Sequence, residues 1–169
     1  MNLVKEVDTA ESLPSTIGRL SACMSAEYFP SGDHVALKRI APGAPLPLAY
    51  YRLWLLHLNM DPPDPDEAWS VLVWGLALMG QGAHNPKRGF GKALAEAKFS
   101  EYRLEQLLSA PEDIRLDLLR RSIRFLAVNG QGFNWLDVAL LVLTRDAEKR
   151  EQLHRKIAAD FYRNMPKDH

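Results

Sequence analysis

Apolar residues recur at helical spacing along nearly the whole chain, and this periodicity limits the possible folds more than any other feature. The alternation of β-branched and polar residues that marks strands is almost absent. We therefore predict an all-α, single-domain bundle of about nine helices. With 169 residues, of which 47% are apolar, the chain can bury a sizeable core.

Prolines, glycines and capping residues set the expected helix ends. The expected ranges are about 15–28, 31–40, 48–58, 66–80, 91–98, 100–109, 111–128, 135–143 and 146–163. The segments 48–58 and 68–79 are apolar nearly all round, which favours burial in the core and leaves a protein interface as the alternative. We divide the chain into an acidic N-terminal helical extension, residues 1–30, and a helical domain, residues 31–169.

Several protein classes are disfavoured. Cys23 is the single cysteine, so the chain can form neither an internal disulfide nor a cysteine-based zinc site. The longest apolar stretch, 68–79, is shorter than a membrane-spanning helix. The N-terminal residues carry acids and lack the apolar core of a secretory signal. We expect a soluble, cytoplasmic protein with no membrane partner.

The search for catalytic motifs favours a protein that is not an enzyme and needs no cofactor. The five histidines show no metal-ligand spacing, and His57 lies in an apolar helix, where a core histidine is the simpler interpretation. The glycine-rich loop 80–91 resembles a phosphate loop only superficially. It lacks the first glycine and the Ser or Thr of a P-loop, and no strand precedes it. A small enzyme with a dispersed site remains a weak alternative.

Charge is balanced overall but segregated along the sequence. The formal net charge is zero, from 21 basic and 21 acidic residues. Residues 34–60 contain three basic residues and no acid, whereas residues 61–67 contain four acids and no base. A neutral chain of this kind can still present one basic face.

A helical wheel of residues 111–128 separates apolar and basic side chains. The apolar arc consists of Ile114, Leu118, Leu119, Ile123, Phe125 and Leu126. The opposite arc carries Arg120, Arg121 and Arg124, with Asp117 among them. Three arginines on one face repel one another unless an anion lies there, although a solvated face with a local Asp117–Arg121 pair is the simpler alternative. Lys149, Lys156 and Arg163 form a second basic ridge at seven-residue spacing.

Six short motifs in a fixed order resemble the CasB family, the small subunit of the type I-E CRISPR surveillance complex called Cascade. They are Leu37-Lys38-Arg39-Ile40, Tyr50-Tyr51-Arg52-Leu53, Gly91-Lys92-Ala93-Leu94, Leu119-Arg120-Arg121, Phe133-Asn134-Trp135 and Asp160-Phe161. The resemblance covers about residues 34–163. Two departures from the family pattern are the acidic loop 61–67 and the acidic extension 1–30.

The resemblance implies a non-enzymatic, all-helical subunit. Two copies would lie head to tail against the Cascade backbone and large subunits, in contact with guide RNA and target DNA. The resemblance implies that the leading contact residues are Arg39, Lys92, Arg121, Lys149 and Arg150. The full set of candidate nucleic-acid-binding residues is Lys38, Arg39, Lys87, Arg88, Lys92, Arg120, Arg121, Arg124, Lys149, Arg150 and Lys156.

These basic residues suit backbone contacts, not base reading, because no helix is rich in Asn, Gln and Arg together. We expect one continuous surface to carry Arg39, Lys92, Arg120, Arg121, Arg124 and the Lys149-Arg150 pair. The main alternative is a helical scaffold or adaptor that binds only proteins and leaves its basic faces in solvent.

Overall fold

A computed structural model describes residues 2–167, with side chains described from Leu13 onward. Within that range the chain forms nine α-helices and one π-helical turn, and it has no β-strand. An isolated bridge pairs His84 with Phe133. One continuous hydrophobic cluster runs through the helices, so the prediction of an all-α, single-domain bundle is confirmed.

The helix bounds follow the expected ranges closely, with two differences. The helices are α1 (Asn2–Ser25), α2 (Ser31–Lys38), α3 (Leu48–Arg52), α4 (Asp66–Met79), α5 (Phe90–Glu96), α6 (Glu101–Ser109), α7 (Glu112–Asn129), α8 (Trp135–Leu143) and α9 (Ala147–Arg163). The first helix starts well before residue 15 and includes Pro14. The expected helix 48–58 is divided into α3 and a π-helical turn, η1 (Leu53–His57), which ends where the Leu58 N–H donates to the Leu53 carbonyl.

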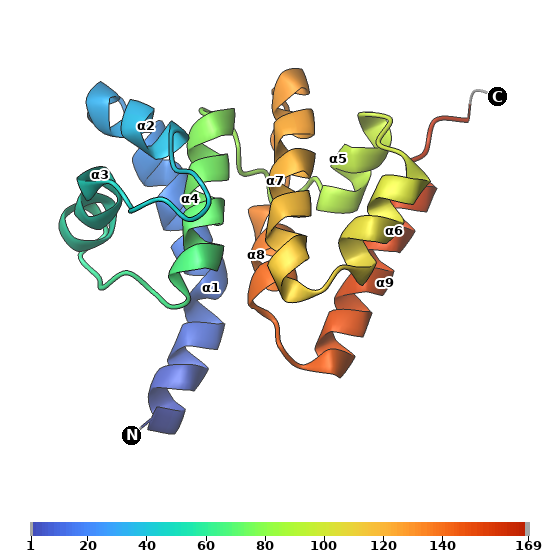
Figure 1. Cartoon of the computed structure of the whole chain (residues 1–169), viewed down its shortest axis with the longest axis horizontal. Helices are drawn as coiled ribbons and strands as arrows, with labels where there is room; N and C mark the ends of the chain where they lie inside the picture. The colour runs from blue at the N-terminus through green and yellow to red at the C-terminus, as the bar shows by residue number, and fades with distance from the viewer. Residues whose placement is uncertain (1, 168–169) are drawn as a thin grey trace.

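The helices form an elongated bundle with α4 and α7 near its middle (Figure 1). Figure 1 shows α2 and α3 at one end of the long axis and α5, α6 and α9 at the other. Helix α4 packs against α2, α7 and α8, and α5 packs against α9. This order places the basic helix α7 between the two ends of the molecule.

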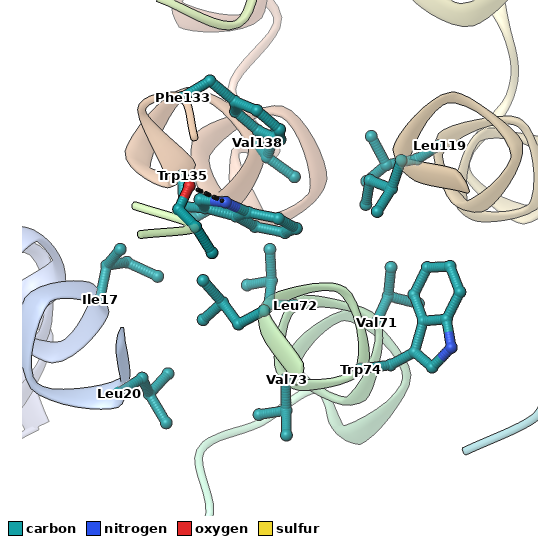
Figure 2. Packing of buried hydrophobic residues seen from close by; sticks show 14 of the residues in the cluster. Ile17, Leu20, Val71, Leu72, Val73, Trp74, Leu119, Phe133, Trp135 and Val138 are labelled. Carbon is teal, nitrogen blue, oxygen red and sulfur yellow. Dashed lines mark hydrogen bonds between the residues drawn. The ribbon is translucent and has the colours of Figure 1, made fainter. Parts of the chain in front are cut away.

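Trp135, the first residue of α8, lies at the centre of the core (Figure 2). Its ring stacks on Phe133 with the ring centroids 4.9 Å apart, and its Nε1 donates a hydrogen bond to the Ala83 carbonyl at 2.9 Å. A Cβ at Gly75 of α4 would collide with the Trp135 ring. Because Gly75 has no side chain, the Trp135 ring fits against α4, and α4 and α8 can pack closely.

Gly91, at the end of the glycine-rich segment 80–91, is the second residue of α5 and lets this helix pack closely against α9. A side chain at Gly91 would run into the backbone carbonyl of Ile157 in α9. The lack of a side chain at Gly91 brings α5 against α9, where the structure places its most extensive contact between two helices. The glycine of the Gly91-Lys92-Ala93-Leu94 motif is thus explained by the close contact between α5 and α9.

The expectation for the two most apolar helices is confirmed for one and wrong for the other. Residues 68–77 of α4 are all buried. The segment 48–58 is only partly buried, because its exposed residues recur at helical spacing on one face that no other element covers, and Leu56 is 72% exposed. The exposed apolar residues of this segment are Leu48, Tyr51, Leu55 and Leu56.

Partly buried histidines make the stability of the fold depend on pH. Burial lowers the pKa of His34, His84 and His154 below the ordinary 6.5. The Nδ1 atom of His84 accepts a hydrogen bond from the Trp135 backbone N–H at 3.1 Å, which requires the neutral imidazole. Protonation therefore favours the unfolded chain, whose histidines keep the higher pKa.

We predict that protonation of these histidines makes the free energy of unfolding fall as the pH drops below about 6.5. In the His84→Gln variant, which keeps an acceptor but does not titrate, this fall should be smaller. Urea unfolding at pH 5, 6 and 7 measures the difference. Equal pH dependence in the two proteins would show that His84 does not contribute.

Candidate nucleic-acid interface

The arginines of α7 do not all lie on the exposed arc. Arg120 is 5% exposed, so its prediction as a surface residue is wrong. Its guanidinium lies over the Trp74 ring at 4.7 Å and donates from Nη1 to the Ile40 carbonyl at 3.4 Å. Burial, and then the charge of Arg124, lower the pKa of Arg120. Arg120 is therefore held mainly by contacts inside the protein, with the Trp74 ring and the Ile40 carbonyl.

Arg121 and Arg124 lie on the exposed face of α7, as the wheel predicts. The Arg124 guanidinium also lies over Trp74, 5.4 Å from the ring centre, where a cation–π contact fixes its position. Arg121 pairs with Asp117 at 3.2 Å, the local pair expected from the sequence, but its side chain is 72% exposed. An exposed pair of this kind is weak and can exchange for a phosphate partner.

Lys38 and Arg39 lie beside this face at the C-terminal end of α2. Both residues are exposed. The Ile40 carbonyl that accepts the Arg120 hydrogen bond directly follows Arg39, so the long Arg120 side chain joins α7 to the residue after α2. Among the described side chains, neither Lys38 nor Arg39 forms an ion pair. We name the exposed cations of α7 and of the end of α2 the α7 basic surface, and they are Lys38, Arg39, Arg121 and Arg124.

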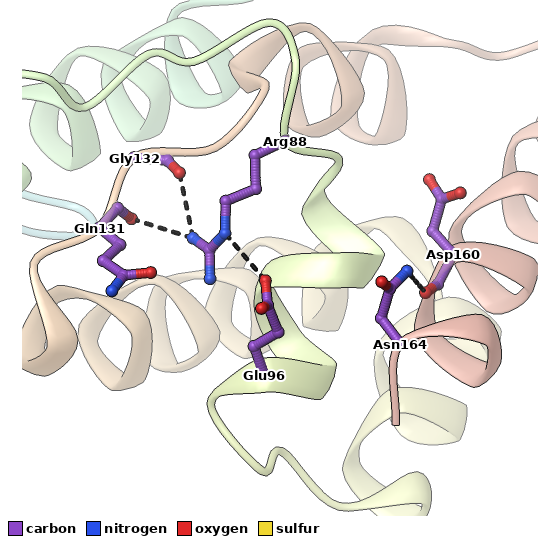
Figure 3. A network of polar contacts seen from close by, with 6 residues as sticks. All are labelled: Arg88, Glu96, Gln131, Gly132, Asp160 and Asn164. Atoms are coloured by element: carbon purple, nitrogen blue, oxygen red, sulfur yellow. Dashed lines mark hydrogen bonds and ion pairs between the residues drawn. The ribbon is translucent and has the colours of Figure 1, made fainter. Parts of the chain in front are cut away.

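Arg88 has an internal role (Figure 3). Its side chain is 16% exposed and binds Glu96 at 3.1 Å and the Gly132 carbonyl at 3.0 Å. Because these partners come from α5 and from the loop before α8, Arg88 ties the glycine-rich loop to both. The neighbouring Lys87 is exposed.

Lys156 and Lys92 lie where α5, α8 and α9 pack together. The Nζ of Lys156 contacts Oδ1 of buried Asp137 at 2.6 Å, and Oδ2 of Asp137 accepts the Phe90 N–H at the start of α5. Lys156 thus neutralises a buried carboxylate, although its side chain remains half exposed. Lys92 is partly buried on α5.

The Lys149-Arg150 pair is not brought to the α7 basic surface. It lies in the first turn of α9, and α2 and α9 occupy opposite ends of the long axis (Figure 1). Lys149 is exposed, while Arg150 lines an open groove between α6 and α9 together with Glu101, Glu105 and Glu151. The groove therefore has a mixed charge, because these three acids lie beside Arg150 and Arg115.

Sequence reasoning missed two parts of the site. Trp74 was expected only as part of the apolar segment 68–79, but its ring also lies beneath the guanidiniums of Arg120 and Arg124. Arg103 of α6 was not among the candidate contact residues, although it lines a cleft together with Arg121. Both roles depend on which helices are neighbours, and no local pattern signals that.

The described residues offer no alternative centre for metal chemistry, since no three His, Cys, Asp or Glu side chains converge as ligands would. No helix in the described range combines the length and hydropathy needed to cross a bilayer.

Comparison with known proteins agrees with the motifs. The family model described as CRISPR-associated protein Cse2 matches residues 34–162, from α2 to the last turn of α9. No curated protein and no solved structure matches the chain significantly.

Proposed function

The chain belongs to the Cse2 family, also called CasB, a non-catalytic subunit family of the type I-E CRISPR complex Cascade, and we propose that it holds a nucleic-acid backbone there. The observation that carries the proposal is the α7 basic surface. Four exposed cations lie on α7 and at the end of α2, and one of them, Arg124, shares the Trp74 ring with the buried Arg120. The guanidiniums of Arg120 and Arg124 share one ring, and an anion would relieve their mutual repulsion.

The physics of target opening makes such a surface useful. Exchange of a DNA duplex for a guide RNA–DNA duplex is nearly balanced in free energy, so modest backbone contacts can shift it. A displaced single strand is flexible and anionic, and Lys and Arg side chains bind it without reading its sequence. We therefore infer that the protein binds guide RNA or target DNA through phosphates and stabilises the R-loop during antiviral defence.

Three further lysines would extend this contact. Lys87, Lys92 and Lys149 are distributed toward the α5–α9 end of the molecule, away from α2. We propose them as secondary contacts, since a strand that follows the long axis would meet them after it leaves α7. Arg88, Arg150 and Lys156 are weaker candidates, because each lies beside carboxylates.

Partner subunits would cover a different surface. The exposed apolar residues of α3 and η1, with Leu56 the most prominent after Leu48, exceed what a free surface helix usually shows. We propose that this surface contacts a Cascade backbone or large subunit, or a second copy of the chain. Assembly within that complex implies a cytoplasmic protein.

The proposal is tested in the assembled complex. We predict that Cascade containing the Arg121→Ala/Arg124→Ala variant forms R-loops more weakly, by about tenfold if two phosphate contacts are lost near physiological salt. Subunit stoichiometry should remain unchanged, because both side chains lie outside the core. Permanganate footprinting of the displaced strand measures the effect.

The matched control is Arg155→Ala, which removes an exposed arginine that also pairs with a carboxylate four residues away. Its complex should open DNA like the wild type. If both complexes open DNA equally well, the α7 basic surface is not a nucleic-acid contact, and the protein-only scaffold becomes the better interpretation.

A further inference from the structure

A small cleft between α6 and α7 lies next to the α7 basic surface. Its volume is about 180 Å³, below the size of drug-sized ligand pockets, so it suits a small polar group. The lining residues are Phe99, Arg103, Gln106, Leu118, Arg121 and Ser122.

The two walls of the cleft each supply a guanidinium. Arg103 comes from α6 and lies 6.0 Å from the centre of the Phe99 ring, which restricts its orientation. Arg121 comes from α7 and is shared with the α7 basic surface. Both residues are exposed, so a ligand can reach them from solvent.

The acids of α6 face the other way. Glu101 and Glu105 line the groove toward α9, and the lining of the α6–α7 cleft contains no carboxylate. The nearest acid shown to contact its lining is Asp117, whose exposed side chain pairs with Arg121. The carboxylates of α6 therefore lie on the side of the helix that faces α9, away from the cleft with α7.

Two guanidiniums on opposite walls, beside a glutamine amide, form a donor set that matches phosphate oxygens. The Gln106 side chain supplies Nε2, which in the free protein donates to the Tyr102 hydroxyl at 3.1 Å. Phe99 and Leu118 provide an apolar floor on which a sugar can pack.

We propose that the α6–α7 cleft binds one phosphodiester group, with Arg103 and Arg121 on either side of it. This inference rests on the proposed function, because the phosphodiester belongs to the strand held by the α7 basic surface. The strand then passes from Arg124 over Arg121 to α6, and Arg103 becomes a contact residue. This path leads the strand away from the groove between α6 and α9, where Glu101 and Glu105 lie.

The test measures binding of the full chain to a single-stranded DNA oligonucleotide and to the matching RNA over a salt series. One phosphate contact on a single strand contributes about 0.7 to the log–log slope, so Arg103→Ala should flatten the slope by about that amount. Arg103→Gln, which keeps the side-chain stem over Phe99, should flatten it equally. If the variants flatten the salt slope for only the DNA or only the RNA, that nucleic acid supplies the phosphodiester.

Arg155→Ala serves as the control, and its slope should equal that of the wild type. If both Arg103 variants keep the wild-type slope while Arg124→Ala reduces it, the cleft is not a phosphate site, although the proposed function stands. If the wild type itself shows no salt-dependent binding, the result contradicts the proposed function and, with it, the phosphate site in the cleft.

Discussion

Replacement of Trp135 by alanine should destabilise the fold by about 3–5 kcal/mol, the usual cost of removing a large aromatic side chain from a core. The ring is fully buried, stacks on Phe133 and fills the space above Gly75. The change also leaves the Ala83 carbonyl without its hydrogen-bond donor. Because small domains are stable by only about 5–15 kcal/mol, this loss is a large share of the total.

Urea unfolding monitored by circular dichroism measures the free energy. Leu56→Ala is the matched control, since Leu56 is a large apolar residue that is 72% exposed, and its replacement should change stability by less than about 0.5 kcal/mol. A Trp135→Ala protein within 1 kcal/mol of the wild type would contradict the central position assigned to this ring.

The second large effect concerns binding. The variant Lys38→Ala/Arg39→Ala/Arg121→Ala/Arg124→Ala should bind single-stranded DNA on the order of a hundredfold more weakly than the wild type at about 0.15 M salt. Four lost phosphate contacts flatten the log–log salt slope by about 2.8. Loss should be similar for every DNA sequence, because phosphate contacts do not read bases.

Thermal melting provides the control for this variant. All four side chains are exposed, so the midpoint should change little, while Arg120 and Trp74 remain in place below them. A correctly folded variant with wild-type affinity would show that the charge cluster has no part in binding.

The sequence predicted the helices well because their ends are local features. Asn134 accepts the Leu136 N–H as the expected cap of α8, and Gly130 adopts a positive φ of 68° where α7 was expected to stop. The long apolar run of α4 is buried as its composition indicates. Local signals of this kind require no knowledge of neighbouring helices.

The binding site was less predictable because it depends on contacts distant in sequence. A helical wheel places Arg120 beside Arg121, but the Ile40 carbonyl, 80 residues away, and Trp74 bury only the former. Arg88 resembles a loop cation until its contact with Gly132, 44 residues away, is seen. The wheel averages over one helix and therefore cannot show which part of its polar face another element covers.

The affinity of the wild-type chain for a single-stranded DNA oligonucleotide, measured by fluorescence anisotropy over a salt series, tests the central claim most directly. We predict a dissociation constant of roughly 10⁻⁴–10⁻⁶ M near physiological salt, as for other nonspecific binders, and a log–log slope of at least about 2.8 in magnitude. The same values should hold for unrelated sequences. Absence of binding, or an affinity independent of salt, would contradict the claim that the α7 basic surface holds a nucleic-acid backbone.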